Sequence, residues 1–432
     1  MKVMVIGNGG AAHAFVTKIN KYPNISVIIC APVNPGIEDV EKVIGYEPAC
    51  INNPVAYLNI ALLEEVDFTI VFPEILLSYG IVDIFEANGL KIFGPNRAAA
   101  IIENSKVFMK DFCNKYKIPT AHYATFTSSG TAKLFMEDHP AFLKSEKSPK
   151  FVVKADGLAQ GKGVIICNDE SSTFSAIKEI MDDRIFGDAG ERIVIEEFLE
   201  GMEFSFMVLT DGYSIIPLAV SRDYKKIYDG DKGANTGGMG SFSSDKIISK
   251  ELQQEIIKDI IQPTIDNMRK EGYPYKGLLY AGLILTNDGV KVLEFNSRFG
   301  DPETQAVLMR LNTEFLGVLE ATTNQRLHEY KLNWKNESSV CVVLVSRGYP
   351  NSYRKGDIIT IPRDIETRQD IEIYHSGTAY NTHGNLVTSG GRVLNVTALG
   401  KTLKDATKKA YEVVDRIEFT GKYTRRDIGY TS

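Results

Sequence analysis

The segment 152–166, VVKADGLAQGKGVII, combines positive charge with backbone freedom in a way that suits an anion. Gly157, Gly161 and Gly163 let the backbone approach a ligand closely, because glycine has no side chain in the way. Lys154 and Lys162 add positive charge that can follow a phosphate. Apolar β-branched residues flank both sides, which predicts a hairpin with a long tip rather than a Walker A loop, which continues into a helix. The hairpin is either a phosphate-binding loop or a mobile surface turn.

A second set of polar residues lies in the segment 290–303, VKVLEFNSRFGDPE. The alternation of a strand puts Glu294 and Asn296 on one face, with Leu293 and Phe295 on the other. A carboxylate beside an amide oxygen is a hard ligand pair for Mg²⁺, which keeps some waters and completes its shell with substrate phosphates. Arg298 follows on the same side if the strand continues, and its guanidinium can fork onto a phosphate oxygen. The alternative is a polar strand end that leads into a turn.

The segment 193–206, IVIEEFLEGMEFSF, carries acidic residues at positions 196, 197, 200 and 203. A buried carboxylate is costly without a partner. At least one of these side chains is therefore expected to accept a hydrogen bond from an adenine amino group or a ribose hydroxyl group. The alternative is a solvated strand edge.

The N-terminal sequence Gly7-Asn8-Gly9-Gly10 follows an apolar run and opens a helical pattern. A helix N-terminus suits an anion, so a substrate phosphate could bind there. A dinucleotide site is disfavoured because Ala12 stands at the third glycine position and the second strand ends in Cys30-Ala31-Pro32, without an acidic residue. A purely structural turn is the other alternative.

Three sets of elements are predicted to position these groups. Residues 1–103 alternate apolar runs with helical patterns, which predicts a parallel sheet with helices on both faces. From about 120 to 192 come the hairpin and one helix, Ser171 to Asp183, a compact unit that could move as a lid. Further strands are expected over 192–210, 278–286 and 290–296, with a helix of about 20 residues from Ser249. The remainder carries strands at 339–346 and 391–398 and a helix from Thr402.

Composition narrows the class of protein. A chain of 432 residues with 44% apolar residues can bury several cores. The net charge of −6, from 49 basic and 55 acidic residues spread evenly, argues against a nucleic-acid binder and favours a small-molecule enzyme. Five dispersed cysteines indicate neither a disulfide framework nor a zinc site. With no signal peptide and no long apolar run, the protein is expected in the cytoplasm, away from membranes.

In their order along the chain, these segments resemble the ATP-grasp superfamily, and within it the phosphoribosylamine–glycine ligase (glycinamide ribonucleotide synthetase) family of purine biosynthesis. The resemblance spans essentially the whole chain. A glycine-rich hairpin alone marks only the superfamily, whereas NTGGMG followed by EFNSRFGDPETQ narrows the resemblance to this ligase family. The matching segments are KADGLAQGKGV (154–164), IFGDAGERIVIEEFLEG (185–201), NTGGMG (235–240), EFNSRFGDPETQ (294–305) and GGRVLNVTALG (390–400).

The resemblance implies an α/β multidomain fold. Its parts would be an N-terminal parallel-sheet (preATP-grasp) substrate domain over 1–103, a two-part ATP-grasp domain over 104–328 with a mobile lid at about 120–192, and a C-terminal α+β domain over 329–432. It also implies a carbon–nitrogen ligase, monomeric or weakly dimeric, that uses ATP and Mg²⁺ or Mn²⁺. The reaction would join glycine to 5-phosphoribosylamine through a glycyl phosphate, giving glycinamide ribonucleotide, ADP and phosphate.

The resemblance further assigns roles by position. Arg298, Asp223 and Lys225 take catalytic roles, with Arg298 stabilising the transferring phosphoryl group. Glu294 and Asn296 hold the metal. ATP contacts fall to Lys106, Lys154, Gly157, Gly161, Lys162, Gly163, Glu196, Glu197, Leu199 and Glu203. Substrate contacts fall to Gly9, Gly10, Pro73, Glu74, Asn235, Gly237 and Gly238.

The chain departs from the family pattern in three places. These are Ala11-Ala12, the stretch Phe72-Pro73-Glu74-Ile75-Leu76-Leu77, and Tyr224 between Asp223 and Lys225. Because they fall where glycine and the ribosylamine are expected, they bear on substrate contacts more than on ATP contacts. Two alternatives therefore stay open: an ATP-grasp ligase or carboxylase that uses another acid or amine, and a nucleotide-binding protein without turnover.

Overall fold

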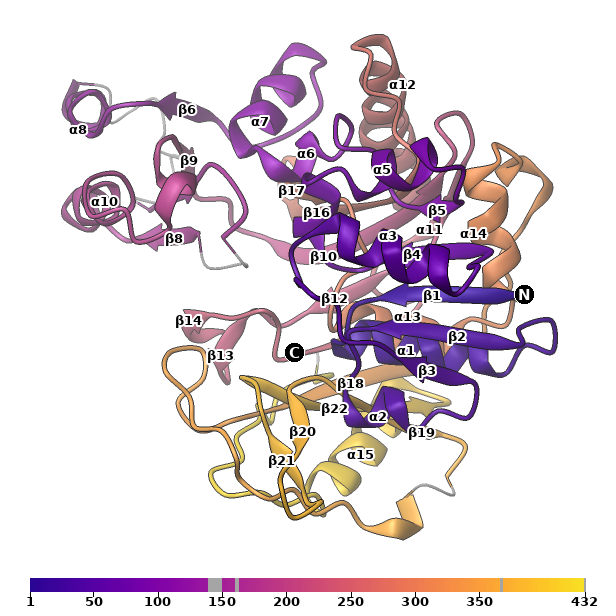
Figure 1. Ribbon diagram of the computed structural model, residues 1–432. Coiled ribbons are helices and arrows are strands. Elements are labelled where there is room, and N and C mark those ends of the chain that lie inside the picture. Colours follow the sequence, from indigo (N-terminus) through magenta and orange to yellow (C-terminus); the bar gives the residue numbers. More distant parts are fainter. Residues whose placement is uncertain (139–149, 160–162, 366–367, 431–432) are drawn as a thin grey trace.

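An open parallel sheet forms the N-terminal part of the molecule. The computed structural model describes residues 1–138, 150–159, 163–365 and 368–430. The sheet has the order β3-β2-β1-β4-β5 and is parallel throughout, which confirms the prediction (Figure 1). Both of its faces are buried, because Val3 and Val5 join one hydrophobic cluster while Met4 and Ile6 join another. The strands are β1 Lys2–Ile6, β2 Val27–Ala31, β3 Val43–Gly45, β4 Phe68–Val71 and β5 Ile92–Phe93, and the helices are α1 Gly10–Asn20, α2 Pro35–Glu38, α3 Pro54–Leu63, α4 Glu74–Ser78 and α5 Ile81–Ala87.

A four-stranded antiparallel sheet, here called the lid sheet, contains the glycine-rich hairpin. Its order is β6-β9-β7-β8, and β7 pairs with β8 from Phe151 opposite Cys167 to Lys154 opposite Val164, which confirms the predicted hairpin. The sheet continues past residue 192, because β9 is one of its two central strands. The elements are α6 Ile101–Asn104, α7 Lys106–Lys115, β6 Tyr123–Phe126, α8 Ser129–Asp138, β7 Phe151–Ala155, β8 Val164–Cys167, α10 Glu170–Ile177 with a π turn Lys178–Asp182, and β9 Ile193–Glu197.

A nine-stranded sheet forms the centre of the molecule and extends into its C-terminal part. Its order is β17-β16-β10-β12-β15-β18-β22-β19, with β11 paired to β10, so the C-terminal strands join through the β15–β18 pair. The strands are β10 Met202–Thr210, β11 Ile215–Pro217, β12 Ser221–Asp223, β15 Gly240–Ser243, β16 Gly277–Thr286, β17 Gly289–Asn296, β18 Ser338–Val345, β19 Ile371–His375 and β22 Arg392–Gly400. Two small hairpins lie beside this sheet, β13 Lys226–Tyr228 with β14 Lys232–Asn235, and β20 Thr378–Tyr380 with β21 Leu386–Thr388.

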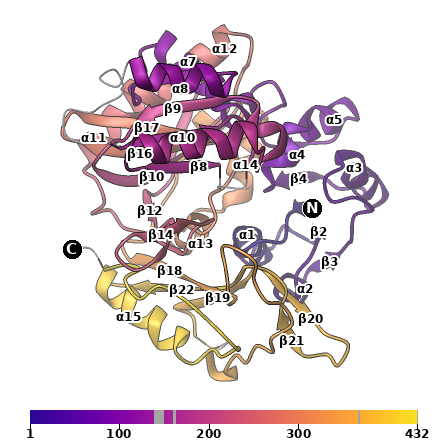
Figure 2. The same cartoon turned by 90° about the vertical axis from the view of Figure 1, so that its left-hand side faces the viewer.

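Helices cover this central sheet. The predicted long helix is confirmed as α11 Lys250–Ile256, a π turn Ile257–Ile261 and α12 Gln262–Lys270, capped by the Ser249 side chain on the Leu252 backbone N–H. In the part of the chain that the structure describes, none of the helices combines the length and apolar character needed to cross a bilayer. Figure 2 shows α15 at the end of the molecule opposite α7 and α12. The remaining helices are α13 Glu303–Arg310, α14 Phe315–Thr323 and α15 Leu403–Val414.

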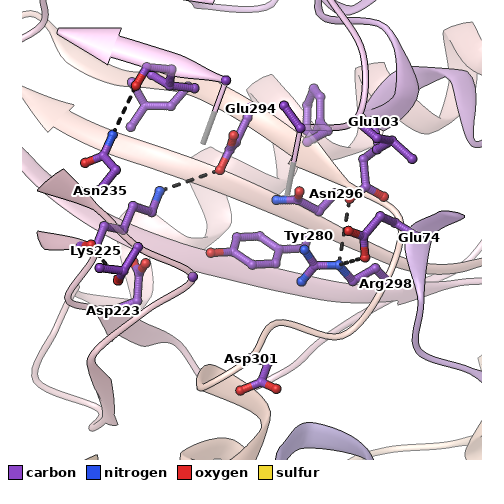
Figure 3. A pocket seen from close by; sticks show the side chains of 18 of the residues that line it. Glu74, Glu103, Asp223, Lys225, Asn235, Tyr280, Glu294, Asn296, Arg298 and Asp301 are labelled. Carbon is purple, nitrogen blue, oxygen red and sulfur yellow. Dashed lines mark hydrogen bonds and ion pairs between the residues drawn. The ribbon is translucent and has the colours of Figure 1, made fainter. Parts of the chain in front are cut away.

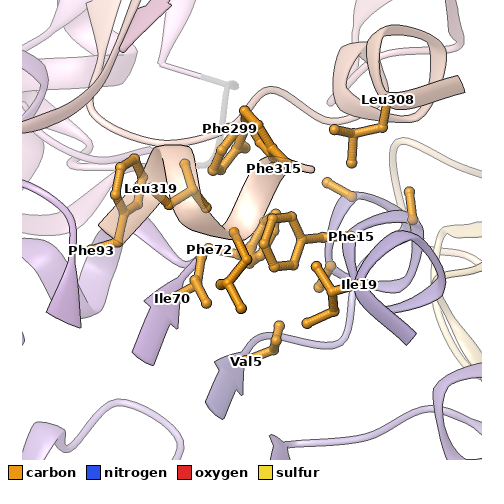
Figure 4. Close-up of a cluster of buried hydrophobic side chains, with 14 of the residues drawn as sticks. Val5, Phe15, Ile19, Ile70, Phe72, Phe93, Phe299, Leu308, Phe315 and Leu319 are labelled. Carbon is orange, nitrogen blue, oxygen red and sulfur yellow. The ribbon is translucent and has the colours of Figure 1, made fainter. Parts of the chain in front are cut away.

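An aromatic cluster joins the N-terminal sheet to the central part (Figure 4). Phe72 stacks on Phe299 with ring centroids 5.5 Å apart, and Phe93 stacks on the same ring at 6.0 Å. Phe15 of α1 meets Phe315 of α14 at 6.3 Å. All five rings are buried, and aromatic pairs in such geometry contribute beyond their area burial. Because Arg298 directly precedes Phe299, the cluster also holds Arg298 close to the loop that follows Phe72.

A buried arginine fastens the C-terminal segment to the hairpin β13–β14. The Arg425 side chain has no exposed surface, and its guanidinium lies 2.8 Å from Asp231 and 2.6 Å from Asp427. It also donates to the Lys226 carbonyl at 3.0 Å and lies 4.8 Å from the centre of the Tyr224 ring. Since the hairpin borders the cleft described below, the last residues of the chain help to hold one of its walls.

We expect Arg425→Met to loosen this hairpin. The partners Asp231 and Asp427 are 60% and 30% exposed, so the loss is that of charge-assisted hydrogen bonds, about 1.5 kcal/mol or more, and amides of residues 226–235 should exchange with solvent roughly tenfold faster or more. Hydrogen exchange followed by mass spectrometry measures this. Arg426→Met is the matched control, because the Arg426 side chain is 52% exposed and its pair with Asp415 is at the surface. Equal exchange in the two variants would contradict the anchoring role.

Candidate active site

A cleft of about 1040 Å³ lies between the lid sheet and strands β10, β16 and β17, with loops of the N-terminal sheet at one end. Figure 3 shows its central part. Gly161 and Lys162, at the tip of the hairpin, lie outside the described residues. The predicted site residues that line the cleft are Gly9, Pro73, Glu74, Lys106, Lys154, Gly157, Gly163, Glu196, Glu197, Leu199, Glu203, Asp223, Lys225, Asn235, Gly237, Glu294, Asn296 and Arg298.

Two predicted substrate residues, Gly10 and Gly238, are not among the residues that line the cleft. A Cβ atom on Gly10 would come within 2.4 Å of Asn395 Nδ2, and one on Gly238 within 2.4 Å of Pro302 Cδ. Gly238 also has a φ of 115°, which favours glycine. Close packing explains both glycines, Gly10 against β22 and Gly238 against the start of α13.

Strand β17 carries the predicted metal ligands on the cleft side. Asn296 lies opposite Tyr280 of β16, and Glu294 lies opposite Gly282. A Cβ atom on Gly282 would approach Glu294 Cγ to 3.1 Å, so this glycine leaves room for the carboxylate. The predicted alternation is right for Phe295, which is buried in the core although it also borders the cleft, and wrong for Leu293, which is only partly buried and is not part of that core. The reason is a register shift at Leu293 that interrupts the regular alternation of the strand.

The charges around Glu294 fit a hard divalent cation. Burial opposes ionisation, but positive charges outweigh it and lower the pKa of Glu294 to about 2; the nearest is Lys225, whose Nζ lies 3.6 Å from Oε1. The carboxylate is therefore ionised at neutral pH. Together with the Asn296 amide oxygen it offers the hard oxygen donors that Mg²⁺ or Mn²⁺ takes. In the described ranges no group of three or more His, Cys, Asp or Glu residues could hold a metal, so waters and substrate oxygens would complete the shell.

Arg298 lies between two carboxylates just beyond the end of β17. Its Nε atom is 3.4 Å from Glu74 Oε2 and 3.8 Å from Glu103 Oε1 (Figure 3). Burial raises the pKa of Glu103 to about 7, while Arg298 acts in the opposite direction. The other oxygen of Glu103 accepts from the Ser297 backbone N–H at 2.7 Å. The guanidinium is thus held at the cleft by one residue of the N-terminal part, Glu74, and by Glu103 of α6.

Lys225 is surrounded by acidic groups. Its Nζ lies 3.8 Å from Glu203 in addition to its contact with Glu294. Burial opposes the charged form, but the negative charges of Asp223, Glu294 and Glu203, in decreasing order, raise its pKa. Burial raises the pKa of Asp223, at the end of β12, to about 7, with Lys225 acting in the opposite direction. Glu303 adds further negative charge beside Asp223 and accepts a 2.5 Å hydrogen bond from the Tyr280 hydroxyl. The arrangement suits a ligand that carries a positively charged or proton-releasing amine.

The side of the cleft that is predicted to bind phosphate is formed by the lid sheet and α7. Lys106 Nζ donates to the Gly157 carbonyl at 2.9 Å, and Lys154 Nζ donates to the Leu293 carbonyl at 3.0 Å. Asn235 Nδ2 reaches the Val164 carbonyl of the hairpin at 3.3 Å. The glycine-rich hairpin is therefore tied to α7, to β17 and to the NTGGMG loop, and Lys154 lies directly beside the strand that carries the predicted metal ligands.

The acidic stretch after Ile195 is not a solvated edge at its first two positions. Glu196 and Glu197 are buried, and both have partners. Glu197 Oε1 accepts from the His122 backbone N–H at 2.9 Å. Glu196, for which a nucleotide contact is predicted, places its two oxygens 2.8 Å from Lys154 and 3.0 Å from Lys110. Its side chain therefore balances lysine charge in the structure.

Comparison with known proteins identifies the family. Family models for phosphoribosylglycinamide synthetase match all three parts of the chain: the N domain over residues 1–103, the ATP-grasp (A) domain over 104–304 and the C domain over 339–431. The chain belongs to the phosphoribosylglycinamide synthetase family. The resemblance stated from the motifs is confirmed, and so is the α/β multidomain fold with an ATP-grasp centre.

Individual members of the phosphoribosylglycinamide synthetase family resemble the chain over its full length. The phosphoribosylamine–glycine ligase of Caldanaerobacter subterraneus subsp. tengcongensis is 44% identical over 99% of both chains, and that of Vibrio vulnificus is 42% identical over 100% of this chain and 98% of its own. The crystal structure of phosphoribosylamine–glycine ligase from Thermotoga maritima matches at a TM-score of 0.83 with 31% identity, covering 99% of this chain and 100% of that one. The biotin carboxylase domain of Hydrogenobacter thermophilus 2-oxoglutarate carboxylase, at a TM-score of 0.73 and 15% identity over 98% of this chain and 91% of that one, shares the fold.

Sequence reasoning missed several charged or polar residues of this site, and four of them take part in the contacts described above. Glu103, Tyr280 and Glu303 line the cleft, and Lys110 lies directly behind it. Glu303 lies inside the matching segment EFNSRFGDPETQ, so the motif could have identified it as a site residue. Lys110 follows Lys106 by one helical turn, which places both lysines on the same side of α7. Glu103 had no comparable signal, because it stands on a four-residue helix without a motif.

We expect Glu294→Ala to weaken metal binding by about 100-fold or more, because the loss of a charged ligand removes several kcal/mol of interaction with a divalent cation. Electron paramagnetic resonance of Mn²⁺, titrated in the presence of ADP, measures the affinity. Asp288→Ala is the control, because Asp288 is an exposed acid in the turn that joins β16 to β17. Wild-type Mn²⁺ affinity in the Glu294 variant would refute the assigned ligand.

Proposed function

We propose that the protein is an ATP-dependent carbon–nitrogen ligase that joins glycine to 5-phosphoribosylamine, giving glycinamide ribonucleotide, ADP and phosphate in purine biosynthesis. The observation that carries the proposal is the full-length similarity to named phosphoribosylamine–glycine ligases, together with a cleft that unites the residues of the matching motifs. We also propose that it acts in the cytoplasm as a monomer or weak homodimer, without nucleic-acid or membrane partners.

The chemistry requires activation of a poor acyl donor. A glycine carboxylate cannot expel an oxide, so its oxygen first attacks the γ-phosphorus of ATP and ADP leaves, which gives glycyl phosphate. The ribosylamine nitrogen then attacks the acyl carbon, phosphate leaves, and the nitrogen loses a proton. Both steps depend on alignment of the reactants, on neutralisation of phosphate charge and on exclusion of water. No protein nucleophile is needed, because the covalent intermediate is on the substrate.

Different residues of the cleft bind the phosphates, stabilise the transferring phosphoryl group and hold the metal. Lys106 and Lys154 hold the ATP phosphates beneath the glycine-rich hairpin, and Arg298 stabilises charge on the phosphoryl group in transfer. Glu294 and Asn296 would hold Mg²⁺ or Mn²⁺, which supplies further neutralisation of phosphate charge when bound.

The acidic residues around Lys225 serve the amines. Asp223, whose pKa is about 7, is suited to accept the proton that the attacking nitrogen releases, since a base acts best when its pKa lies near the working pH. Lys225 keeps the neighbouring carboxylates in place through its contacts with Glu203 and Glu294. Glu74, at the N-terminal end of the cleft, fixes Arg298 and borders the substrates.

The test is ADP formation by the purified protein, with 5-phosphoribosylamine generated in the assay. We expect turnover that requires ATP, glycine, the amine and a divalent cation, and that stops on chelation. We expect Lys154→Ala to raise the KM for ATP by about tenfold or more, because it removes one charge from the phosphate site. ATP binding without stimulation by glycine and the amine would contradict the proposed substrates. Since Ala11 and Ala12 line the cleft, a screen of other acids and amines would then follow.

A further inference from the structure

Lys110 is a buried cation that the proposed mechanism does not use. Its side chain has no exposed surface, and it is not among the residues that line the cleft. Its Nζ lies 3.0 Å from Glu196 Oε2 and donates to the Thr120 hydroxyl at 2.7 Å. The Thr120 hydroxyl in turn donates to the Val292 carbonyl of β17 at 2.7 Å. A lysine is rarely buried without a charged partner, so its position needs a reason.

Glu196 connects this lysine to the cleft. The carboxylate is 2% exposed, and its other oxygen lies 2.8 Å from Lys154 Nζ. Lys110, Glu196 and Lys154, here called the charge triad, therefore consist of one carboxylate between two ammonium groups, with a net single positive charge. Only Glu196 and Lys154 reach the cleft. The unpaired positive charge of the triad is thus on the side where a ligand binds.

The charge balance matters because ATP is a polyanion. A carboxylate 2.8 Å from the lysine that should hold phosphate would cancel its charge and repel the ligand, and this effect is large where water is scarce. Burial opposes ionisation of Glu196, yet the charges of Lys110 and Lys154 together hold its pKa below the ordinary value, so it stays charged. A second lysine on the far side compensates this negative charge.

We propose that Lys110 is a positioning residue for ATP, which neutralises Glu196 from behind and so leaves the charge of Lys154 free for the phosphates. This inference rests on the proposed function, in which Lys154 holds ATP. Glu196 acts as the spacer that allows two lysines to be buried together, because without it their ammonium groups would repel each other. Lys110 also fixes the direction of Glu196 through the hydrogen bond to Thr120, which is tied to β17.

A purely structural ion pair would give different results from this charge mechanism. In Lys110→Met the triad has no net charge, and in the double variant Lys110→Met/Glu196→Gln it regains the single positive charge of the wild type. If charge decides, the double variant binds ATP more tightly than Lys110→Met. If Lys110 serves only to hold the fold, removing a second member of the network does not restore binding.

The experiment is calorimetric titration of ATP, inorganic tripolyphosphate and adenosine into the whole protein without glycine or amine. We expect Lys110→Met to bind ATP and tripolyphosphate about tenfold more weakly or worse, with no change for adenosine, and the double variant to bind tripolyphosphate within about threefold of the wild type. Thr120→Val is the matched control, because it removes the hydrogen bond and keeps the charge; we expect less than about a threefold change. Far-UV circular dichroism verifies folding.

Two results would overturn the inference. One is wild-type tripolyphosphate affinity in Lys110→Met, and the other is a double variant that binds tripolyphosphate more than about tenfold more weakly than the wild type. The second comparison holds even if Lys110→Met alone does not fold, since the double variant no longer has a buried carboxylate that has lost one of its two lysine partners. Failure of the wild-type protein to bind ATP would instead overturn the proposed function, and the inference with it.

Discussion

The structure depends on the pairing of opposite charges around the cleft between its sheets. A charge removed from water is stable only beside a partner, and the attraction or repulsion between neighbours grows as the surroundings become less polar. Glu294 faces Lys225, Arg298 lies between Glu74 and Glu103, and Glu196 lies between Lys110 and Lys154. Each of these groups needs its partners at hydrogen-bonding or ion-pair distance. The strands, helices and loops that carry them must therefore be held in precise positions relative to one another.

The aromatic cluster and the shared sheet supply that placement. Phe299 follows Arg298 directly and packs on Phe72, which precedes Pro73 and Glu74. The stacked rings therefore keep the Arg298 guanidinium and the Glu74 carboxylate within ion-pair distance of each other. On the other side, the β15–β18 pairing joins the C-terminal strands to the sheet that carries β10, β16 and β17, and Arg425 fastens the hairpin beside Lys225. Residues far apart in the chain meet because rigid hydrophobic contacts lie immediately next to the charged ones.

Much of this could be predicted from local sequence patterns. The alternation of apolar runs with helical patterns in the first hundred residues predicted the parallel sheet. The β-branched residues on both sides of the glycine-rich loop predicted the hairpin, and Ser249 marked the start of the long helix. The strand period placed Glu294 and Asn296 together, but it failed at Leu293, because a register shift between strands depends on the partner strand. Gly10 and Gly238 belong to the matching motifs, yet the need for glycine comes from Asn395 and Pro302, which no local pattern connects to them.

The charge states of the acids show why the remainder of the site needed the structure. Glu294, Glu103 and Asp223 all carry a carboxyl group, but the pKa of Glu294 is about 2 while burial raises those of Glu103 and Asp223 to about 7. The difference comes from the balance with the neighbours: cations outweigh burial around Glu294, whereas around Glu103 and Asp223 burial outweighs the opposing cation, Arg298 or Lys225, and other acids raise the pKa further. The first state suits a metal ligand and the second suits proton transfer. The chemistry open to a carboxylate is therefore decided by the charges that the fold brings to it, and Lys110, behind Glu196, shows that such a charge can lie outside the cleft.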